Sequence, residues 1–277
     1  MANILSKEKR AQIVRCMVEG NSIRATSRMT GCCKEAIMKL LCALGSACLE
    51  FQDKTLRELP CKRIQCDEIW AFVGCKEGHL RPDEHGQGRG DVWTWTALDP
   101  DTKLIPCWHV GLREPSDAIL FMENLASRLA NRIQLSTDGF LGYLPAVENA
   151  FGDDVDYGRV IKVFGQALDQ TRMEARYSPA RCKEVKLLAV TGEPDSDHIC
   201  TSHNERNNLT MRMQMRRFTR LTNAFSKKME NHAHAVNLHM MHYNFARIHQ
   251  TIRCTPAMES GIADRVWTIE EIVGLLG

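Results

Sequence analysis

The order of helical and strand-like segments is the feature that most constrains the fold of this chain. Residues 6–44 have apolar residues at helical spacing, and from Cys61 on the apolar residues gather into short strand-like runs. Three runs come first and predict consecutive antiparallel strands at 64–73, 92–98 and 103–110. The pattern then predicts a helix at 117–130, a strand ending at 138, a helix at 144–151 and a strand at 159–164. This order indicates an α/β fold, in which helices flank a mixed sheet.

Two aspartates lie in strands that this order of segments is expected to bring side by side. Three antiparallel strands followed by helix, strand, helix and strand is the order of the ribonuclease H-like fold, where the middle of the first strand lies beside the end of the fourth. Asp67 lies within the first run, and Asp138 ends the fourth, just before Gly139. We therefore expect the two carboxylates to meet, although each is also compatible with an ordinary strand-end or turn residue. Asp99 lies in an Asp-Pro-Asp-Thr sequence and is interpreted as a turn residue.

A third carboxylate, Glu205, opens a basic stretch that is typical of a helix. A helix packed on the sheet would bring Glu205 to the pair, unless it is simply a first-turn acid favoured by the helix dipole. Oxygen ligands from separate elements suit Mg2+, with Mn2+ as a substitute, and such a site can hold two ions about 3.5 to 4 Å apart. Glu68 alternates to the opposite strand face and is expected to be a peripheral charge. His203 is a candidate to contact a scissile phosphate or order the metal ligands, or alternatively to cap the helix.

The amino-terminal residues predict a small helical domain. Ser6 and Ser22 can each cap a helix, and a turn at Thr30-Gly31-Cys32 leads into a third helix. A short helix, a turn with Gly and a helix with exposed cations form the helix-turn-helix arrangement, whose second helix enters the major groove of DNA. A plain helical interaction module is the alternative. The candidate DNA contacts in this domain are Arg24, Arg28, Lys34 and Lys39.

A run of cations follows Glu205. Between residues 206 and 228 there are seven Lys or Arg and no acid, which favours a basic helix that holds a phosphate backbone over a solvated surface helix of mixed charge. The candidate DNA contacts in this run are Arg206, Arg212, Arg216, Arg217, Arg220, Lys227 and Lys228. His239 and His242 lie nearby at helical spacing, and we interpret them as core or DNA-facing residues rather than metal ligands.

Composition excludes several classes of protein. The net charge of +2 is small, so an argument for nucleic-acid binding depends on where the cations lie. Twelve scattered cysteines without a Cys-x2-Cys pair are expected to be reduced thiols. The chain has neither an apolar run of membrane-spanning length nor a signal-peptide pattern at its start, and we expect a cytoplasmic protein. The expected organisation is a helix-turn-helix domain at 1–55, a catalytic domain at 56–255 with an insertion at about 166–200, and a tail at 256–277.

Three acidic segments resemble a known family. Cys66-Asp-Glu-Ile-Trp-Ala-Phe-Val-Gly74, Ser136-Thr-Asp-Gly139 and His203-Asn-Glu-Arg-Asn-Asn-Leu-Thr-Met-Arg212 are similar to the acidic motifs of DDE transposases of the insertion-sequence-one type. The resemblance extends through Phe225-Ser-Lys and His242-Tyr-Asn-Phe245, and so covers roughly residues 61–256. The cysteine zinc finger that often precedes the helix-turn-helix in that family is absent from this sequence.

The resemblance implies a magnesium-dependent DNA transposase. Asp67, Asp138 and Glu205 would bind the metal ions, and the enzyme would cleave the ends of its own element and join the 3′ ends to target DNA. Two ends must be processed together, which implies a homodimer or a higher oligomer. The alternatives are a nuclease or resolvase on the same fold, and a DNA-binding regulator that has lost catalysis.

Overall fold

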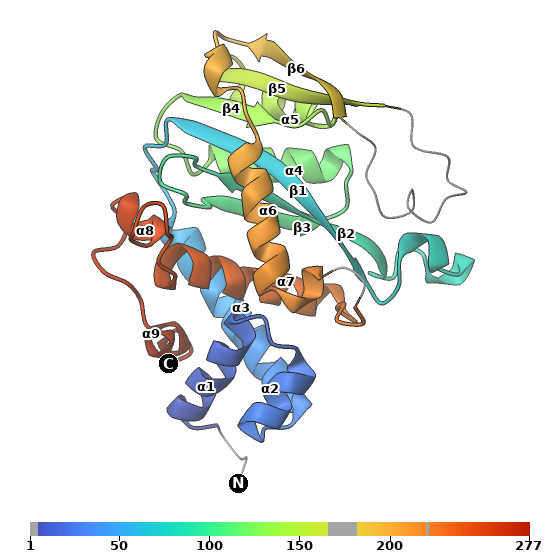
Figure 1. Cartoon of the computed structure of the whole chain (residues 1–277), viewed down its shortest axis with the longest axis vertical. Helices are drawn as coiled ribbons and strands as arrows, with labels where there is room; N and C mark the ends of the chain where they lie inside the picture. Colours follow the sequence, from blue (N-terminus) through green and yellow to red (C-terminus); the bar gives the residue numbers. More distant parts are fainter. Residues whose placement is uncertain (1–4, 166–181, 220–221) are drawn as a thin grey trace.

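A six-stranded mixed sheet forms the centre of the protein. The computed structural model describes residues 5–165, 182–219 and 222–277 of the 277-residue chain. The strands lie in the order β3-β2-β1-β4-β5-β6 (Figure 1). Their bounds are Arg63–Val73 for β1, Gly90–Leu98 for β2, Cys107–Gly111 for β3, Ile133–Thr137 for β4, Val155–Phe164 for β5 and Cys182–Thr191 for β6. The expected α/β class is confirmed, and the sheet is compatible with the expected ribonuclease H-like fold.

The pairing of the strands places the ends of β1 and β4 in the middle of the sheet. β1 pairs antiparallel with β2 and parallel with β4, while β2 and β3 are antiparallel. β5 pairs parallel with β4 and antiparallel with β6. β6 lies inside the stretch that the sequence suggested as an insertion, so residues 182–191 extend the sheet at its edge. The turn before β3 is closed by Asp99, which accepts hydrogen bonds from the Asp101 amide and the Thr102 hydroxyl, as expected.

Helices cover both faces of the sheet. α4 (Pro115–Ala126) and α5 (Tyr143–Phe151) lie behind it in Figure 1, and α6 (Ser202–Gln214) crosses in front. Trp95 of β2 is fully buried on the α4 and α5 side, within 6 Å of the rings of Phe121 and Tyr143. The other face buries apolar residues of β1 against α6 and α7 (Met229–Met241). β1 and β2 therefore have one face in each of two apolar layers, and the site lies where polar residues interrupt these layers.

The amino-terminal helices have the predicted starts. α1 (Lys7–Val18) and α2 (Ile23–Thr30) begin after Ser6 and Ser22, whose hydroxyls accept hydrogen bonds from the first turn of each helix. Gly31 has a φ of 70°, the left-handed conformation that ends α2. α3 (Lys34–Thr55) follows after two residues. The four candidate DNA contacts of this region, Arg24, Arg28, Lys34 and Lys39, are all exposed.

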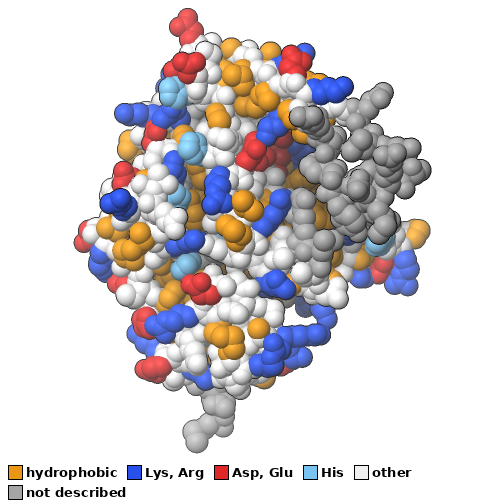
Figure 2. Space-filling model, in the orientation of Figure 1, with side chains coloured by type: hydrophobic (Ala, Val, Ile, Leu, Met, Phe, Trp, Pro, Cys, Tyr) orange, Lys and Arg blue, Asp and Glu red, His pale blue; other side chains and the backbone are white. Residues whose placement is uncertain are grey.

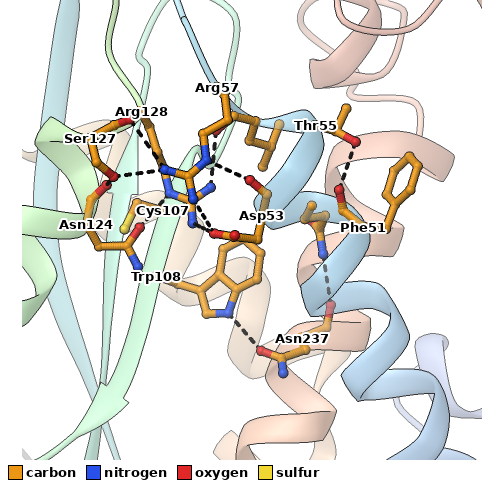
Figure 3. A network of polar contacts seen from close by, with 12 residues as sticks. Phe51, Asp53, Thr55, Arg57, Cys107, Trp108, Asn124, Ser127, Arg128 and Asn237 are labelled. Carbon is orange, nitrogen blue, oxygen red and sulfur yellow. Dashed lines mark hydrogen bonds and ion pairs between the residues drawn. The ribbon is translucent and has the colours of Figure 1, made fainter.

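α3 joins the amino-terminal helices to the sheet. It continues for 22 residues and packs along α7, where a Cβ at Gly45 would lie 2.6 Å from the Cβ of His234. Near its end, Asp53 accepts a hydrogen bond from the buried guanidinium of Arg128, which also bonds the Leu56 carbonyl (Figure 3). One apolar cluster runs from α1 through α3 to the sheet. Although the predicted boundary at residue 55 coincides with the end of α3, residues 1–55 share their core with the rest of the chain.

The carboxyl-terminal segment packs back on the amino-terminal helices. A π-helical turn (His242–Ala246) follows α7, and two short helices follow it, α8 (Pro256–Glu259) and α9 (Ile269–Gly274). α9 contacts α1, and Ile272 and Val273 belong to the same apolar cluster as the first helix. Within the ranges that the structure describes, no helix combines the length and apolar character needed to cross a membrane.

Candidate metal site

The ends of β1 and β4 bring Asp67 and Asp138 together. Gln65 pairs with Ser136 in the parallel register, so the two aspartates, two residues farther along, lie level with each other. Oxygens of Asp67, Glu68 and Asp138 all lie within 4.8 Å of one another. The expected meeting of the two aspartates is confirmed, and Glu68 adds a third carboxylate that we had expected to be peripheral.

Backbone and side-chain amides hold the two aspartates in place. Asp138 Oδ1 accepts a hydrogen bond from the Phe140 amide at 2.9 Å, which fixes the turn after β4. Asp67 Oδ1 accepts one from the Glu68 amide at 2.9 Å, and Oδ2 accepts one from Asn208 Nδ2 at 2.8 Å. Because Asn208 belongs to α6, Asp67 lies on the α6 face of the sheet.

Glu68 approaches the same point from the opposite face of β1. Its Oε2 lies 3.3 Å from Arg113 Nε, and the same guanidinium donates a hydrogen bond to Asp138 Oδ2 at 3.0 Å. Arg113 is held between the rings of Trp93 and Phe140, 5.1 and 4.7 Å from their centroids. Glu68 Oε1 is buried, and burial raises the pKa of Glu68, which the nearby hydroxyl of Tyr143 acts to lower. Strand alternation was therefore correctly predicted, but the side chain is long enough to reach Asp138 at the strand end.

The crowding of carboxylates changes their acidity. Burial, and next the charge of Asp138, raise the pKa of Asp67 to about 7. The same two causes, in the same order, raise the pKa of Glu68 to about 8. Both groups therefore retain protons at a pH where an exposed carboxyl group is ionised. A cation that bound here would replace those protons.

Buried asparagines fix α6 on the sheet. Asn204 donates hydrogen bonds to the carbonyls of Gln65 and Thr96, at 2.9 and 2.6 Å, and accepts one from the Thr96 hydroxyl. Gln65 Oε1 accepts the backbone amide hydrogens of His203 and Asn204 at the start of the helix. These bonds pair polar groups that would otherwise be buried without partners, and they set the rotation of the first turn of α6.

Glu205 lies beside the carboxylate cluster rather than within it. Its carboxylate accepts hydrogen bonds from Lys162 of β5 and from the Thr201 hydroxyl, the latter at 2.7 Å. Burial acts to raise its pKa, but the bonds from Lys162 and Thr201 outweigh burial and lower it. The charges of Glu205 and Lys162 both act on Asp67. Four carboxylates therefore face two cations, Arg113 and Lys162, which the sequence analysis did not identify.

His203 points away from the carboxylates and contacts Lys103 instead. Its Nδ1 lies 3.4 Å from Lys103 Nζ, at the turn before β3. Residues two apart on a helix lie on opposite sides, so once Glu205 faces β5, His203 faces the other flank. The imidazole makes no capping bond either, because the capping acceptor is Gln65. Proximity in sequence therefore does not bring His203 to the carboxylates, and its expected contact with a scissile phosphate stays a prediction.

The cations after Glu205 do not form one continuous helix. α6 ends at Gln214, and a 3-10 turn covers residues 216–218. Arg217 is turned inward and donates a hydrogen bond to Ser226 at 2.6 Å, and its burial lowers its pKa to about 10. Arg212 is half-buried, and Arg220 lies outside the described residues. The exposed members of the run are Arg206, Arg216, Lys227 and Lys228.

The histidines and cysteines behave as the sequence analysis expected. Burial lowers the pKa of His239 to about 3 and that of His242 to about 4, so both are neutral interior residues. All twelve cysteines are free thiols. Neither a protein-family model nor a curated protein matches the sequence of this chain.

Proposed function

We propose that this chain is a DNA transposase that uses Mg2+ to cleave the ends of its own element and to join the freed 3′ ends to target DNA. The observation that carries the proposal is the meeting of Asp67 and Asp138 at neighbouring strand ends, with Glu205 delivered beside them by α6. This arrangement agrees with the ribonuclease H-like catalytic domain implied by the three sequence motifs.

The residues present suit a hard divalent cation. All the candidate ligands are carboxylate oxygens, the donors that Mg2+ and Mn2+ prefer. The raised pKa values of Asp67 and Glu68 mark negative charge that Arg113 and Lys162 leave uncompensated. One Mg2+ ion matches the excess of two carboxylates over cations in charge, and phosphates of the DNA substrate would match the charge of a second. In this proposal Asp67, Asp138 and Glu205 hold the metal ions, two in each site.

Each side chain has a separate part in the proposed reaction. When bound, the metal ions would activate the attacking oxygen and stabilise the leaving oxygen at phosphorus. Asp67 is oriented by Asn208 and by its own strand, so its oxygens face α6, the side of the sheet that carries Glu205. Arg113 fixes Asp138 from the opposite side. Lys162 holds Glu205 and supplies positive charge near the phosphate before metal arrives.

The amino-terminal helices supply the proposed recognition of the element ends. α2, the turn at Gly31 and the start of α3 have the spacing of a helix-turn-helix, and Lys34 and Lys39 are exposed on α3. Because α3 shares its core with α7, the proposed DNA-binding helices are attached rigidly to the catalytic sheet. The DNA-binding helices and the metal site would then lie at a fixed distance from each other. A dimer would hold the two ends of the element.

The test uses duplexes of the DNA that flanks the gene on both sides. The full-length protein in Mg2+ should nick these duplexes and transfer the 3′ ends to a plasmid. Asp67→Asn and Asp138→Asn should lose both activities, by a factor of at least roughly 1,000, while they still bind the duplex. Asp156→Asn is the matched control, because Asp156 lies in β5 and pairs with Arg132 instead.

Two results would overturn the proposal. One is cleavage by Asp138→Asn at the wild-type rate, which removes the metal site from the reaction. The other is a wild-type protein that neither binds nor cuts duplex DNA. Cleavage without transfer of precleaved 3′ ends would instead identify a nuclease or resolvase.

A further inference from the structure

A second group of polar side chains lies on the other flank of α6 and has no part in the site described above. Three segments contribute to it: the turn before β3, the first turns of α6, and the chain that follows the π-helical turn. We call it the flank cluster, and it consists of Lys103, His203, Arg206, Arg247 and His249.

The fold holds these segments together. Asn244 accepts a hydrogen bond from the Ile105 amide at 3.1 Å and donates one to the Ile105 carbonyl at 3.0 Å. This pair fixes the chain after α7 against the turn that carries Lys103. Lys103 Nζ in turn lies 3.4 Å from the His203 ring. The folded core therefore fixes the backbone segments that carry the cluster, while its side chains lie at or near the surface.

Positive charge dominates the flank cluster. After burial, the charges that lower the pKa of His249 are those of Lys103, Arg247 and Arg206. The nearby carboxylate of Asp101 is already paired with Arg63, and Asp99 is occupied by its own turn. Arg247 Nη1 is buried without a hydrogen-bond partner among the described residues. Grouped cations repel one another, and a bound anion would relieve that repulsion.

The position of the flank cluster relative to the carboxylates indicates which anion it binds. His203 and Glu205 lie on opposite sides of α6, and a helix is about 10 Å across. In Figure 2 histidine side chains follow one flank of the face crossed by α6, and a group of acidic side chains lies on the other side of it. Along one strand of duplex DNA a phosphate recurs about every 3.4 Å of helix axis, so this separation corresponds to about three nucleotides.

We propose that the flank cluster binds backbone phosphates of the same DNA strand whose scissile phosphate reaches the carboxylates. Lys103 and Arg206 make the charged contacts, and the cluster sets the register of the strand across α6. The inference rests on the proposed function, since it takes DNA as the substrate. It also gives His203 a phosphate-facing position that is separate from the metal ions.

The test measures DNA affinity against salt concentration. Full-length wild-type protein and the double variant Lys103→Gln with Arg206→Gln are titrated into a fluorescein-labelled duplex of 30 base pairs, without divalent cations. Glutamine keeps a polar side chain that can form hydrogen bonds but removes the charge. The control variant is Lys54→Gln with Arg265→Gln, two exposed cations already paired with Glu50 and Glu271. Thermal melting checks that all three proteins fold.

The double variant should bind at least roughly fivefold more weakly at 100 mM salt, and the slope of log affinity against log salt should fall by about two. The control should match the wild type in both quantities. If wild type and double variant share one affinity and one slope, the flank cluster makes no phosphate contact and the inference fails, while the proposed function stands. If wild type shows no salt-dependent binding to DNA, the proposed function itself fails. Should the double variant fail to fold, Arg206→Gln alone, at an exposed helix position, must lower the slope by about one.

Discussion

Asp67→Asn should stabilise the metal-free protein at alkaline pH. The wild-type carboxyl group has a pKa of about 7 in the folded state, mainly because it is buried and next because it faces Asp138. In the unfolded chain its pKa returns to about 3.9. The folded protein therefore binds this proton more tightly, so its stability falls as the pH rises from about 4 through 7. Asparagine carries no charge and does not incur this loss.

The pKa of Asp67 sets an upper limit to the stabilisation expected from Asp67→Asn. A difference of about three pKa units corresponds to about 4 kcal/mol in the free energy of unfolding above pH 7. The substitution preserves the local hydrogen bonds, because Asn208 can turn its amide over. Its Oδ1 is buried without a partner among the described residues, and it can accept a bond from the new amide. We therefore expect Asp67→Asn to gain up to about 4 kcal/mol at pH 8 and almost nothing at pH 4.

The assay is urea unfolding of both proteins, without divalent metal, at several values between pH 4 and 8.5. Asp156→Asn provides a control of opposite sign, since hydrogen bonds from Arg132 and the Glu193 amide lower the pKa of Asp156. That variant should be less stable than the wild type by an amount that stays nearly constant between pH 4 and 8.5, because the lowered pKa of Asp156 places its titration below this range. Addition of Mg2+ at pH 8 should stabilise the wild type and have little effect on Asp67→Asn. A difference between wild type and Asp67→Asn that does not vary with pH would refute the reasoning.

Two further predictions concern how α3 is attached to the rest of the chain. Gly45→Val should destabilise the protein by at least about 2 kcal/mol in urea unfolding, because the valine side chain would collide with the backbone of α7 at His234. Ser46→Ala is the control, since it changes an exposed residue next to Gly45 and should leave the free energy of unfolding nearly unchanged. Arg128→Met should cost about 2 to 3 kcal/mol by the same measurement, because it leaves the buried Leu56 carbonyl without its guanidinium donor and removes one of the two guanidinium groups that bond Asp53. A loss below about 0.5 kcal/mol would show that solvent replaces the bonds.

The parts of the fold that depend on local sequence patterns could be predicted from the sequence. A strand-like run of apolar residues predicted β1, and serine before each helix predicted the starts of α1 and α2. β6 was missed, because it is an edge strand with exposed side chains and so lacks the burial pattern that identifies a strand. The length of α3 was underestimated because its second half is stabilised by α7, which comes nearly 200 residues later in the chain.

The candidate site was predictable only where position along a strand determined it. Asp67 and Asp138 could be paired from strand order alone, since parallel register fixes their relative level. Lys162 and Arg113 could not be found in this way. Each reaches the site from a neighbouring strand or loop, and a single cation in an apolar run does not indicate which carboxylate it faces. Hydrogen bonds from Asn204 to β1 and β2 set the rotation of α6 about its axis. This rotation determines the flank on which His203 lies, and the sequence does not show it.

The choice between Glu68 and Glu205 as the third metal ligand follows from access. Glu68 is nearer to both aspartates, but its side chain is only 1% exposed and one oxygen is held by Arg113. Glu205 has a side chain that is 41% exposed, and only Lys162 and Thr201 hold it. A metal ion that must also contact a DNA phosphate needs an open side, which only Glu205 provides.

We therefore predict different outcomes for two conservative substitutions. Glu205→Gln should abolish cleavage in Mg2+, by a factor of at least roughly 1,000, with an unchanged melting temperature. Glu68→Gln should keep part of the activity and should stabilise the metal-free protein at pH 9, since the raised pKa of Glu68 makes its ionised form unfavourable in the folded state. Measured cleavage rates, melting temperatures and Mn2+ affinities of both variants separate the two roles. If Glu68→Gln is inactive and Glu205→Gln cleaves normally, the metal ion binds on the face of β1 that carries Glu68. DNA is then not cut on the face of the sheet that α6 crosses.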